Sequence, residues 1–572
     1  MKGIKFCFHY TKNINRFVIA GAILQVLSAV FCVLVPTVGS MIITKYYDKV
    51  FPQILGMACL YFLLRLLTAA AVFFLDRIDV KIYAEIIHGV SKDVLDSVFH
   101  VSQSDIDRRG SGIYGRRLTE DTEEMAQGFI KITNGISECL YYVGNTIAIL
   151  VICPAAFLCV IPMYICVVIL ESLRRKAVRK NEQEFKTAKD SVHRLGAELI
   201  AGSADIRALD LEKEIMKNAL GRIWKGTASK KALTKTSSAY TFSEKLVIIV
   251  FNFVYILVVA WLVCKDRLSA AYGIVLFNYG INLGLPVLYI INNAITELSV
   301  FNVSAERLNS LINGQGYEKE HFGTVHLERA EGRIDFEHVS FSYMKRNEPG
   351  FRKNIDDISF HIDPCEVAAI AGKNGVGKTT LFNLLSGLYS NYTGSIRLDG
   401  IELKDLDRES LKKNISLVSQ HPYFFSGTIR DNLTMAVPGI TEERMMDACR
   451  DAGIHDTIVK KANGYDTMLG EGGSGMSGGQ LMRLAVARAF LRDTPVILMD
   501  EAGAHLDENR EAIMDAFTKY RGKKTILYIS HMAENIELAD RILYFVSKNS
   551  VVCGTYESLK ECCPEFEAFC KN

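Results

Sequence analysis

A glycine-rich segment at residues 372–380, GKNGVGKTT, is the part of the sequence whose residue types point most directly to chemistry. It follows a short apolar run, VAAIA, and precedes a helix-forming stretch, LFNLLSGLY. Glycines let backbone N–H groups curl around phosphate oxygens, and the positive N-terminal end of the next helix adds to the attraction. The spacing G-x-x-x-x-G-K-T between a strand and a helix therefore predicts a phosphate-binding loop.

The side chains and backbone of this loop have separate expected roles. Lys378 is expected to contact the β- and γ-phosphates of a nucleotide, and the Thr379 hydroxyl is expected to bind Mg²⁺. A nucleoside triphosphate and Mg²⁺ are therefore the predicted ligands. The nucleotide contacts expected from the loop are Gly372, Asn374, Gly375, Val376, Gly377, Lys378, Thr379 and Thr380.

A second apolar run, VILM at residues 496–499, ends in two acids, Asp500 and Glu501. In such a pair the first carboxylate holds Mg²⁺ and the second orients the attacking water. Many strands end in solvated acids, so the pair alone is a weak signal. Its place downstream of a phosphate-binding loop makes it specific.

Residues 476–480, MSGGQ, resemble the LSGGQ signature of ATP-binding-cassette (ABC) proteins. The segment TMLGEGG at 467–473 is similar to the X-loop of exporter-type members, and AHLD at 504–507 stands where the family has its D-loop, usually SALD. Met476 replaces the usual leucine with a side chain of similar volume. Ala504 and His505 replace the Ser and Ala of the usual D-loop. In the family this segment crosses between the two ATP sites, so the replacement bears on communication between those sites.

The remaining cassette positions occur in the order that the family shows. The resemblance implies that Tyr343 stacks on adenine, that Gln420 is the Q-loop glutamine and that His531 is the switch histidine. Tyr343 as strand packing and His531 as a structural histidine are the plain alternatives. The implied catalytic residues are Glu501, His531 and Lys378; the metal ligands are Thr379, Gln420 and Asp500; and the signature contributes Ser477, Gly478, Gly479 and Gln480.

Length and composition indicate how many domains must position these motifs. At 572 residues the chain is longer than one hydrophobic core usually serves, so at least two domains are expected. Hydrophobic residues make up 49% of the chain and charged residues 23%, a mixture that predicts separate membrane and soluble parts. The net charge of +2 gives no support to nucleic-acid binding.

Long uncharged runs in the first half of the chain predict membrane-spanning helices, each of which needs about 20 apolar residues. Residues 17–44 carry no charge, and residues 50–75 are interrupted only by Arg65. Residues 139–170 are too many for one helix and include Pro154 near their middle, which predicts two helices joined by a tight external turn. The expected spans are 17–44, 50–75, 132–153, 155–173, 246–264 and 270–296.

Basic residues gather before the first span, at 2–16, and after the fourth, at 174–180. Because Lys and Arg near span ends stay in the cytoplasm, both ends of the membrane region should face it. The internal connections 76–131 and 171–245 are long, charged and rich in helix formers, which predicts helices that continue below the membrane. Within them, residues 102–117 and 199–209 resemble the coupling helices of exporter-type ABC transporters.

The predicted fold is a multidomain membrane protein. A six-helix, all-α transmembrane domain with long cytoplasmic helical extensions is expected at 1–312, a linker at 313–331, and an α/β P-loop ABC ATPase domain at 332–572. The resemblance to exporter-type half-transporters with the type IV fold covers essentially the whole chain.

Polar residues at membrane depth predict a substrate pathway. Asn278, Asn282, Tyr289 and Asn293 are spaced by four, seven and four, so they fall within about 60° on one helical face. Arg65 would cost at least about 2.5 kcal/mol if it faced lipid. One interpretation is that these side chains line the pathway. The alternative is that the amides bridge helices and Arg65 pairs with an acid or a carbonyl.

The family resemblance implies a dimer, because the P-loop of one subunit and the signature of the other enclose each ATP. The expected partners are a second half-transporter (homodimer or heterodimer), the lipid bilayer and a transported substrate, without nucleic acid. We expect ATP-driven export of a peptide, lipid-like or other small amphipathic substrate by alternating access, from a plasma membrane with the ATPase domain and both termini in the cytoplasm. Import of a siderophore-like metal–chelator complex and a non-transporting ABC ATPase are the alternatives.

Overall fold

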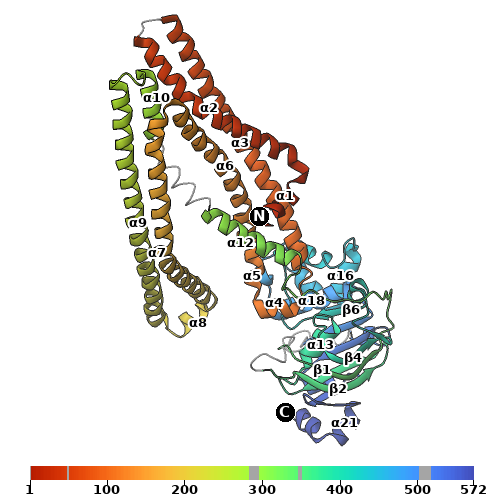
Figure 1. Cartoon of the computed structure of the whole chain (residues 1–572). Helices are drawn as coiled ribbons and strands as arrows, with labels where there is room; N and C mark the ends of the chain where they lie inside the picture. The colour runs from red at the N-terminus through yellow and green to blue at the C-terminus, as the bar shows by residue number, and fades with distance from the viewer. Residues whose placement is uncertain (1, 48–50, 282–294, 345–350, 501–516, 572) are drawn as a thin grey trace. The chain divides into compact units, whose positions relative to one another are not determined.

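The computed structural model describes residues 2–47, 51–281, 295–344, 351–500 and 517–571 (Figure 1). The chain forms two compact units. The first comprises Met1–Val98 and Gly112–Gln315 and is helical; the second comprises Phe99–Ser111 and Gly316–Asn572 and contains every named strand that the structure describes.

The chain before Gly316 is helical. The helices that the structure describes there are α1 (Lys2–Tyr10), α2 (Asn15–Tyr47), α3 (Phe51–Val98), α4 (Gln103–Arg109), α5 (Ser111–Arg116), α6 (Thr122–Ile152), α7 (Pro154–Ala201), α8 (Ser203–Ala208), α9 (Glu212–Cys264), α10 (Ala270–Ile281) and α12 (Ile295–Ile312). All of these except α4 lie wholly or mainly in the first unit. Helices α2, α3, α6, α7 and α9 are long, as the sequence predicts.

Five helices among the described residues are long and apolar enough to cross a membrane, and they overlap the first five predicted spans. The predicted sixth span, 270–296, lies partly outside the described residues. Large apolar side chains such as Phe62, Val151 and Phe253 are exposed on these helices, as expected of surfaces that meet lipid or another chain.

A proline lies at the junction between α6 and α7, the third and fourth of the five long apolar helices. Helix α6 ends at Ile152, Cys153 is extended, and α7 begins at Pro154, where a missing N–H and a fixed φ suit the first helical position. The predicted tight turn is therefore present. The predicted helical connections are present as well, because α3, α7 and α9 have 48, 48 and 53 residues, about twice what a bilayer requires.

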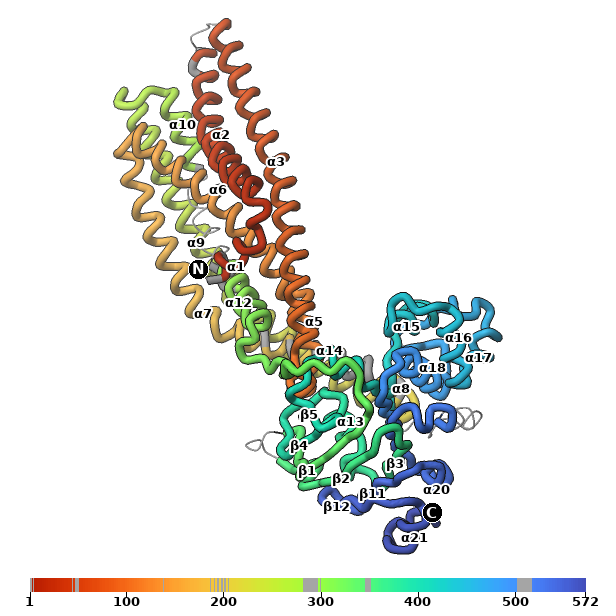
Figure 2. The backbone as a smooth tube through the Cα atoms, turned by 90° about the vertical axis from the view of Figure 1, so that its right-hand side faces the viewer, coloured from red at the N-terminus to blue at the C-terminus, as the bar shows by residue number. Residues whose placement is uncertain are grey.

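Within the first unit, α2 lies beside α3, and α7 lies beside α9 with the short α8 at their shared end (Figures 1 and 2). Buried apolar residues of α6, α7, α9 and α10 form one core cluster. Tyr279 joins α10 to α2, because its hydroxyl donates to the Val33 carbonyl at 2.6 Å and lies 2.7 Å from the Thr37 hydroxyl.

The second unit contains two main sheets. The antiparallel sheet has the order β2-β1-β4-β5 and the mainly parallel sheet has the order β12-β11-β3-β10-β9-β6; a small sheet pairs β7 with β8. The strands are β1 (Ile334–Phe341), β2 (Ile355–Ile362), β3 (Val367–Gly372), β4 (Thr393–Leu398), β5 (Ile401–Glu402), β6 (Ile415–Val418), β7 (Gly427–Thr428), β8 (Met468–Leu469), β9 (Val496–Met499), β10 (Thr525–Ile529), β11 (Arg541–Ser547) and β12 (Ser550–Gly554).

Helices cover the parallel sheet, and one core cluster lies between the two sheets while a second extends among the helices. Figure 2 shows α15, α16, α17 and α18 grouped apart from β1, β2 and β4. The helices are α13 (Lys378–Leu385), α14 (Arg408–Asn414), α15 (Ile429–Thr434), α16 (Glu442–Asp451), α17 (His455–Val459), α18 (Gly478–Leu491), α20 (Ala533–Ile536), α21 (Tyr556–Cys562) and α22 (Pro564–Cys570).

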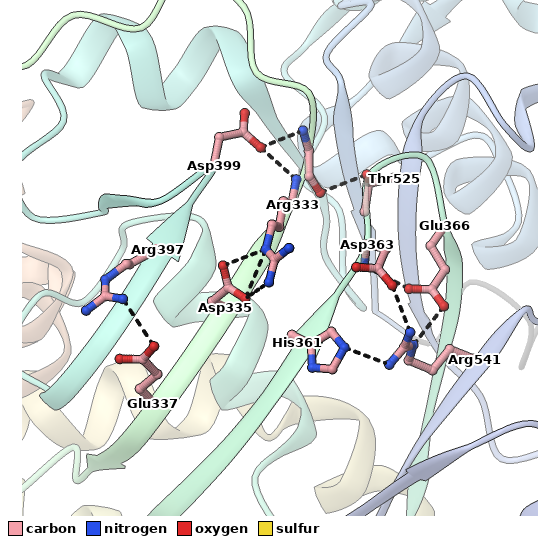
Figure 3. Close-up of polar contacts among 11 residues, drawn as sticks. Arg333, Asp335, Glu337, His361, Asp363, Glu366, Arg397, Asp399, Thr525 and Arg541 are labelled. Carbon is pink, nitrogen blue, oxygen red and sulfur yellow. Dashed lines mark hydrogen bonds and ion pairs between the residues drawn. The ribbon is translucent and has the colours of Figure 1, made fainter.

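At the amino edge of the parallel sheet, side chains bond to one another and to nearby backbone (Figure 3). Arg541 donates to Glu366 at 2.7 Å and to Asp363 at 3.0 Å. The Thr525 hydroxyl donates to the Gly332 carbonyl at 2.9 Å, and the Asp399 carboxylate accepts backbone N–H groups of the segment before β1. This edge therefore ties the two sheets together.

Candidate functional site

The carboxyl edge of the parallel sheet brings the separate sequence motifs together. Strands β3, β6, β9 and β10 are parallel: the last residues of β6 and β9 pair, β10 ends one residue beyond β9, and β3 ends two residues beyond β10. The phosphate-binding loop follows β3, Gln420 follows β6, Asp500 follows β9 and His531 follows β10. Ligands of open parallel sheets bind at this edge, so the topology supports one common site.

The backbone of the loop requires glycine at specific points. Gly377 has a φ of 112°, and a Cβ there would lie 2.8 Å from the Asn354 carbonyl oxygen. At Gly372 a Cβ would lie 2.5 Å from the carbonyl oxygen of Phe545. These contacts leave no room for a side chain, so the glycines keep the loop backbone close to β11 and to the segment before β2.

Lys378 is buried at the first position of α13, and its ammonium group points back over the loop. Its Nζ donates to the carbonyls of Gly372 at 2.9 Å and Lys373 at 3.0 Å. Lys373, Asn374 and the neighbouring Gly375 are exposed. A cation held against an exposed glycine loop at a helix N-terminus is an arrangement that binds phosphate.

Tyr343 lies after β1 and is attached to the helix of this loop. Its hydroxyl lies 3.1 Å from the Thr380 hydroxyl and accepts a hydrogen bond from Asn383 at 3.1 Å. Its ring is exposed and meets Phe341 and Tyr389 edge-on, with centroids 4.9 and 5.0 Å apart. The ring is thus held beside the loop with surface left for stacking.

Sequence reasoning did not single out Asn383 or Tyr389. Both lie outside the recognised motifs. The only available signal for Asn383 was its helical spacing of three from Thr380, which places the two on one face of α13. For Tyr389 the sequence offers no comparable signal.

The expected metal ligands are oxygen donors around the sheet edge. Asp500 is buried, and its N–H donates to the Val418 carbonyl of β6 at 2.9 Å, which fixes it beside the strand that leads to Gln420. Thr379 is exposed on α13. Among the described residues no cluster of three or more His, Cys, Asp or Glu could hold a metal alone. A hydroxyl, an amide and one carboxylate fit Mg²⁺, which usually shares its shell with water and substrate phosphates.

The signature residues form the exposed N-terminus of α18, a helix of 14 residues. The Ser477 hydroxyl accepts the Gln480 N–H at 3.3 Å, and the Gln480 side chain accepts the Ser477 N–H at 3.2 Å. This capping box leaves the N–H groups of Gly478 and Gly479 at the first helical positions, where a helix has no internal partners for them. The signature therefore presents backbone donors that suit an anion.

Of the remaining predicted cassette residues, His531 is among those that the structure describes and three are not. His531 follows Ser530, whose N–H donates to the Ile370 carbonyl of β3 at 3.2 Å. The predicted catalytic Glu501 and the D-loop residues Ala504 and His505 lie outside the described residues.

Two of the five predicted pathway residues are among those that the structure describes. Arg65 is exposed on α3, with its Nε 3.4 Å from the Tyr61 hydroxyl and its guanidinium 5.7 Å from the Tyr61 ring centroid. Asn278 is exposed on α10 and donates to the Ile274 carbonyl at 3.1 Å. Asn282, Tyr289 and Asn293 lie outside the described residues.

Two family models match the chain, one in each part. The model described as ABC transporter transmembrane region matches residues 18–282. The model described as ABC transporter matches residues 355–504. The first match covers the long apolar helices and the second covers the phosphate-binding loop, the signature and the acids after β9.

Curated relatives match mainly through shorter segments. A beta-(1→2)glucan export ATP-binding/permease protein, NdvA, of Bartonella bacilliformis is 37% identical over 41% of this chain and 38% of its own length. An ATP-dependent lipid A-core flippase of Vibrio vulnificus is 34% identical over 52% of this chain and 50% of its own. An uncharacterized ABC transporter ATP-binding protein, YknV, of Bacillus subtilis is 27% identical over 83% and 78%.

Proposed function

The chain belongs to the ABC transporter family and joins that family's transmembrane region to its ATPase domain, and from this premise we propose that it is an ATP-driven exporter. It would act as one half of a dimeric transporter in the plasma membrane. The substrate class we propose is a peptide, a lipid-like molecule or another small amphipathic compound. The ATPase domain and both termini would lie in the cytoplasm, following the distribution of basic residues.

One observation carries this proposal. The carboxyl edge of the parallel sheet joins a complete phosphate-binding loop to Asp500, Gln420 and His531, in the same chain as helices suited to a membrane. Two of the relatives are named as an exporter and a flippase, which favours export over the import of a metal–chelator complex.

The residues of the site have distinct roles in the proposed hydrolysis. Lys378 neutralises charge on the β- and γ-phosphates, and Asp500, with Thr379 and Gln420, holds Mg²⁺, which supplies further charge neutralisation when bound. Glu501 orients or deprotonates the attacking water. His531 holds the γ-phosphate. Each well-placed group of this kind is typically worth about 10² to 10³ in rate.

A second copy or a related chain completes the site in this proposal. The exposed N-terminus of α18 offers Ser477 and the N–H groups of Gly478 and Gly479 to a phosphate. When these donors come from a second subunit, ATP gains contacts only in the closed dimer. Differential binding of this kind is what drives a conformational change.

Vesicles with a known orientation test the proposal. The full chain is reconstituted so that some vesicles expose the ATPase domain outward, and fluorescent phospholipid and peptide probes are followed after ATP is added outside. We expect Mg²⁺-dependent hydrolysis and accumulation of a probe inside these vesicles. Loss of a preloaded probe would favour import, and hydrolysis that no probe alters and no transport accompanies would favour the non-transporting ATPase.

We propose that Arg65, Asn278, Asn282, Tyr289 and Asn293 line the substrate pathway. Arg65→Ala should abolish probe-stimulated hydrolysis and spare the basal rate. Arg77→Ala is the matched control, because Arg77 stacks on Phe73 at 4.7 Å in the same helix but lies beyond the predicted span. Normal probe transport by Arg65→Ala, at matched expression, would remove Arg65 from the pathway.

A further inference from the structure

Helix α4 belongs to the same compact unit as the ATPase domain, although it stands between α3 and α6 in the sequence. The segment before it pairs with the chain after α12. Val101 forms an antiparallel bridge with Lys319, and the Ser102 N–H donates to the Glu318 carbonyl at 2.8 Å. This short backbone ladder fixes the position at which α4 begins.

Helix α4 carries two acids with different partners: one pairs with arginines of α4 itself, and the other bonds to a residue outside the helix. The Asp105 carboxylate is buried and forms ion pairs with Arg108 and Arg109 of the same helix. Asp107 is exposed and accepts a hydrogen bond from Gln103 at 2.7 Å. The second oxygen of Asp107 accepts the phenol hydrogen of Tyr389, which lies after α13.

Tyr389 is buried, and its side chain contacts Asp107 through the hydroxyl and Tyr343 through the ring. Its hydroxyl bonds to Asp107, and its ring meets the ring of Tyr343 at a centroid distance of 5.0 Å and an interplanar angle of 82°. Burial, together with the Asp107 carboxylate, raises the pKa of Tyr389. The phenol therefore stays protonated and remains a hydrogen-bond donor.

Tyr343 in turn is tied to the helix of the phosphate-binding loop through Thr380 and Asn383, each at 3.1 Å. An adenine base stacked on Tyr343 would restrict the ring. Because edge-to-face aromatic contacts depend on orientation, that restriction would be felt by Tyr389. A continuous set of contacts thus runs from Tyr343 through Tyr389 to Asp107 of α4.

We propose that Tyr389 is a positioning residue that transmits occupancy of the adenine site to α4, and so to the connection between α3 and α6. The inference rests on the proposed function, since it takes Tyr343 as the adenine-stacking residue. Its specific consequence is that α4 responds to the base and not only to the phosphates. A triphosphate without a base fills the phosphate-binding loop but leaves Tyr343 untouched.

Amide hydrogen exchange of the full chain in lipid nanodiscs tests this inference. Exchange in α4 is compared without ligand, with adenylyl imidodiphosphate and with tripolyphosphate, each with Mg²⁺. The variants are Tyr389→Phe and Asp107→Ala, and the double variant tests whether the two act through one bond. Tyr392→Phe is the matched control, because Tyr392 is also a buried phenol that donates to a carboxylate, that of Glu402 at 2.8 Å on β5.

In the unaltered chain, the adenine nucleotide should slow exchange in α4 at least about threefold, and tripolyphosphate should not. Tyr389→Phe, Asp107→Ala and the double variant should all lose this slowing, and Tyr392→Phe should keep it. The KM for ATP in basal hydrolysis should stay within about twofold for Tyr389→Phe, because the hydroxyl of this residue is not in the ATP site.

Retained slowing in Tyr389→Phe, or equal slowing by tripolyphosphate, would overturn the inference. A uniform rise in exchange with and without nucleotide, with the slowing retained, would likewise make Tyr389 a structural residue only. If the proposed function itself is wrong, the result differs from these outcomes, because the unaltered chain would then neither bind the nucleotide nor hydrolyse ATP.

Discussion

At the amino edge of the parallel sheet, polar side chains close on one another, whereas at the carboxyl edge exposed glycine backbone and the start of α13 face outward. Arg541, Glu366 and Asp363 form one closed group at the first edge. At the second edge, Lys378 lies beside the exposed residues 373–375. The same sheet therefore separates polar groups that stabilise the fold from polar groups suited to a ligand.

Because of this contrast, ion pairs do not mark the candidate site. Partly exposed ion pairs contribute little to stability individually, and their presence says nothing of function. The functional edge is instead marked by backbone conformations that only glycine adopts easily. Substitutions at the two edges should accordingly have different effects, on turnover at one and on stability at the other.

The largest expected effect is that of Glu501→Gln. The acid follows Asp500 at the carboxyl edge, so its loss should slow ATP hydrolysis at least about 10²-fold while ATP still binds. Steady-state hydrolysis and filtration binding of labelled ATP measure the two quantities, and the thermal midpoint provides the control for folding. Near-normal turnover would remove Glu501 from its catalytic role.

The next effect separates two glycines of the loop. Gly377→Ala combines a φ of 112° with a contact of 2.8 Å to the Asn354 oxygen, whereas a Cβ at Gly375, at a φ of 77°, meets nothing within 4 Å. We expect Gly377→Ala to weaken ATP binding at least about tenfold, and Gly375→Ala to weaken it less. Titration with a fluorescent ATP analogue compares them. Equal losses would mean that conformation alone, and not the close approach, matters.

A smaller effect, on stability, is expected at the amino edge. Arg541→Ala removes hydrogen bonds to Glu366 and Asp363, and should destabilise the ATPase domain by about 1 kcal/mol, or lower its thermal midpoint by about 2–4 °C. The KM for ATP should not change. A clear rise in KM without a change in the midpoint would contradict the division between the two edges.

The smallest expected effect concerns pH at the helix that leads into β6. The Ser410 N–H, with His326 and the Ser410 side chain, lowers the pKa of Asp407 from 3.8 to about 2. The stability that this carboxylate contributes is therefore complete at pH values well above 3.8 and is lost progressively as the pH falls through 3.8 toward about 2. The thermal midpoint of Asp407→Asn should fall less steeply over this interval than that of the unaltered chain. Parallel curves would show that the capping contact adds nothing.

Much of the fold was predictable because local patterns dictate it. Hydrophobic runs of sufficient length predict membrane helices at any position in the fold, and a proline at the right place predicts the turn before α7. The phosphate-binding loop was predictable because its glycines are required by local geometry. The residues around Tyr343 were not predictable, since Tyr389 and Asp107 meet only after a separation of 282 residues.

The sequence by itself determined the chemistry of this protein, because a strand, a glycine loop and a helix start bind phosphate through backbone groups that neighbouring residues position. It also determined which half enters the membrane, because burial in lipid depends on the length of apolar runs. Only the tertiary structure decided that Gln420, Asp500 and His531 share one edge, since this follows from the order and register of parallel strands. Only the tertiary structure assigned α4 to the ATPase unit, because that assignment depends on contacts between distant segments.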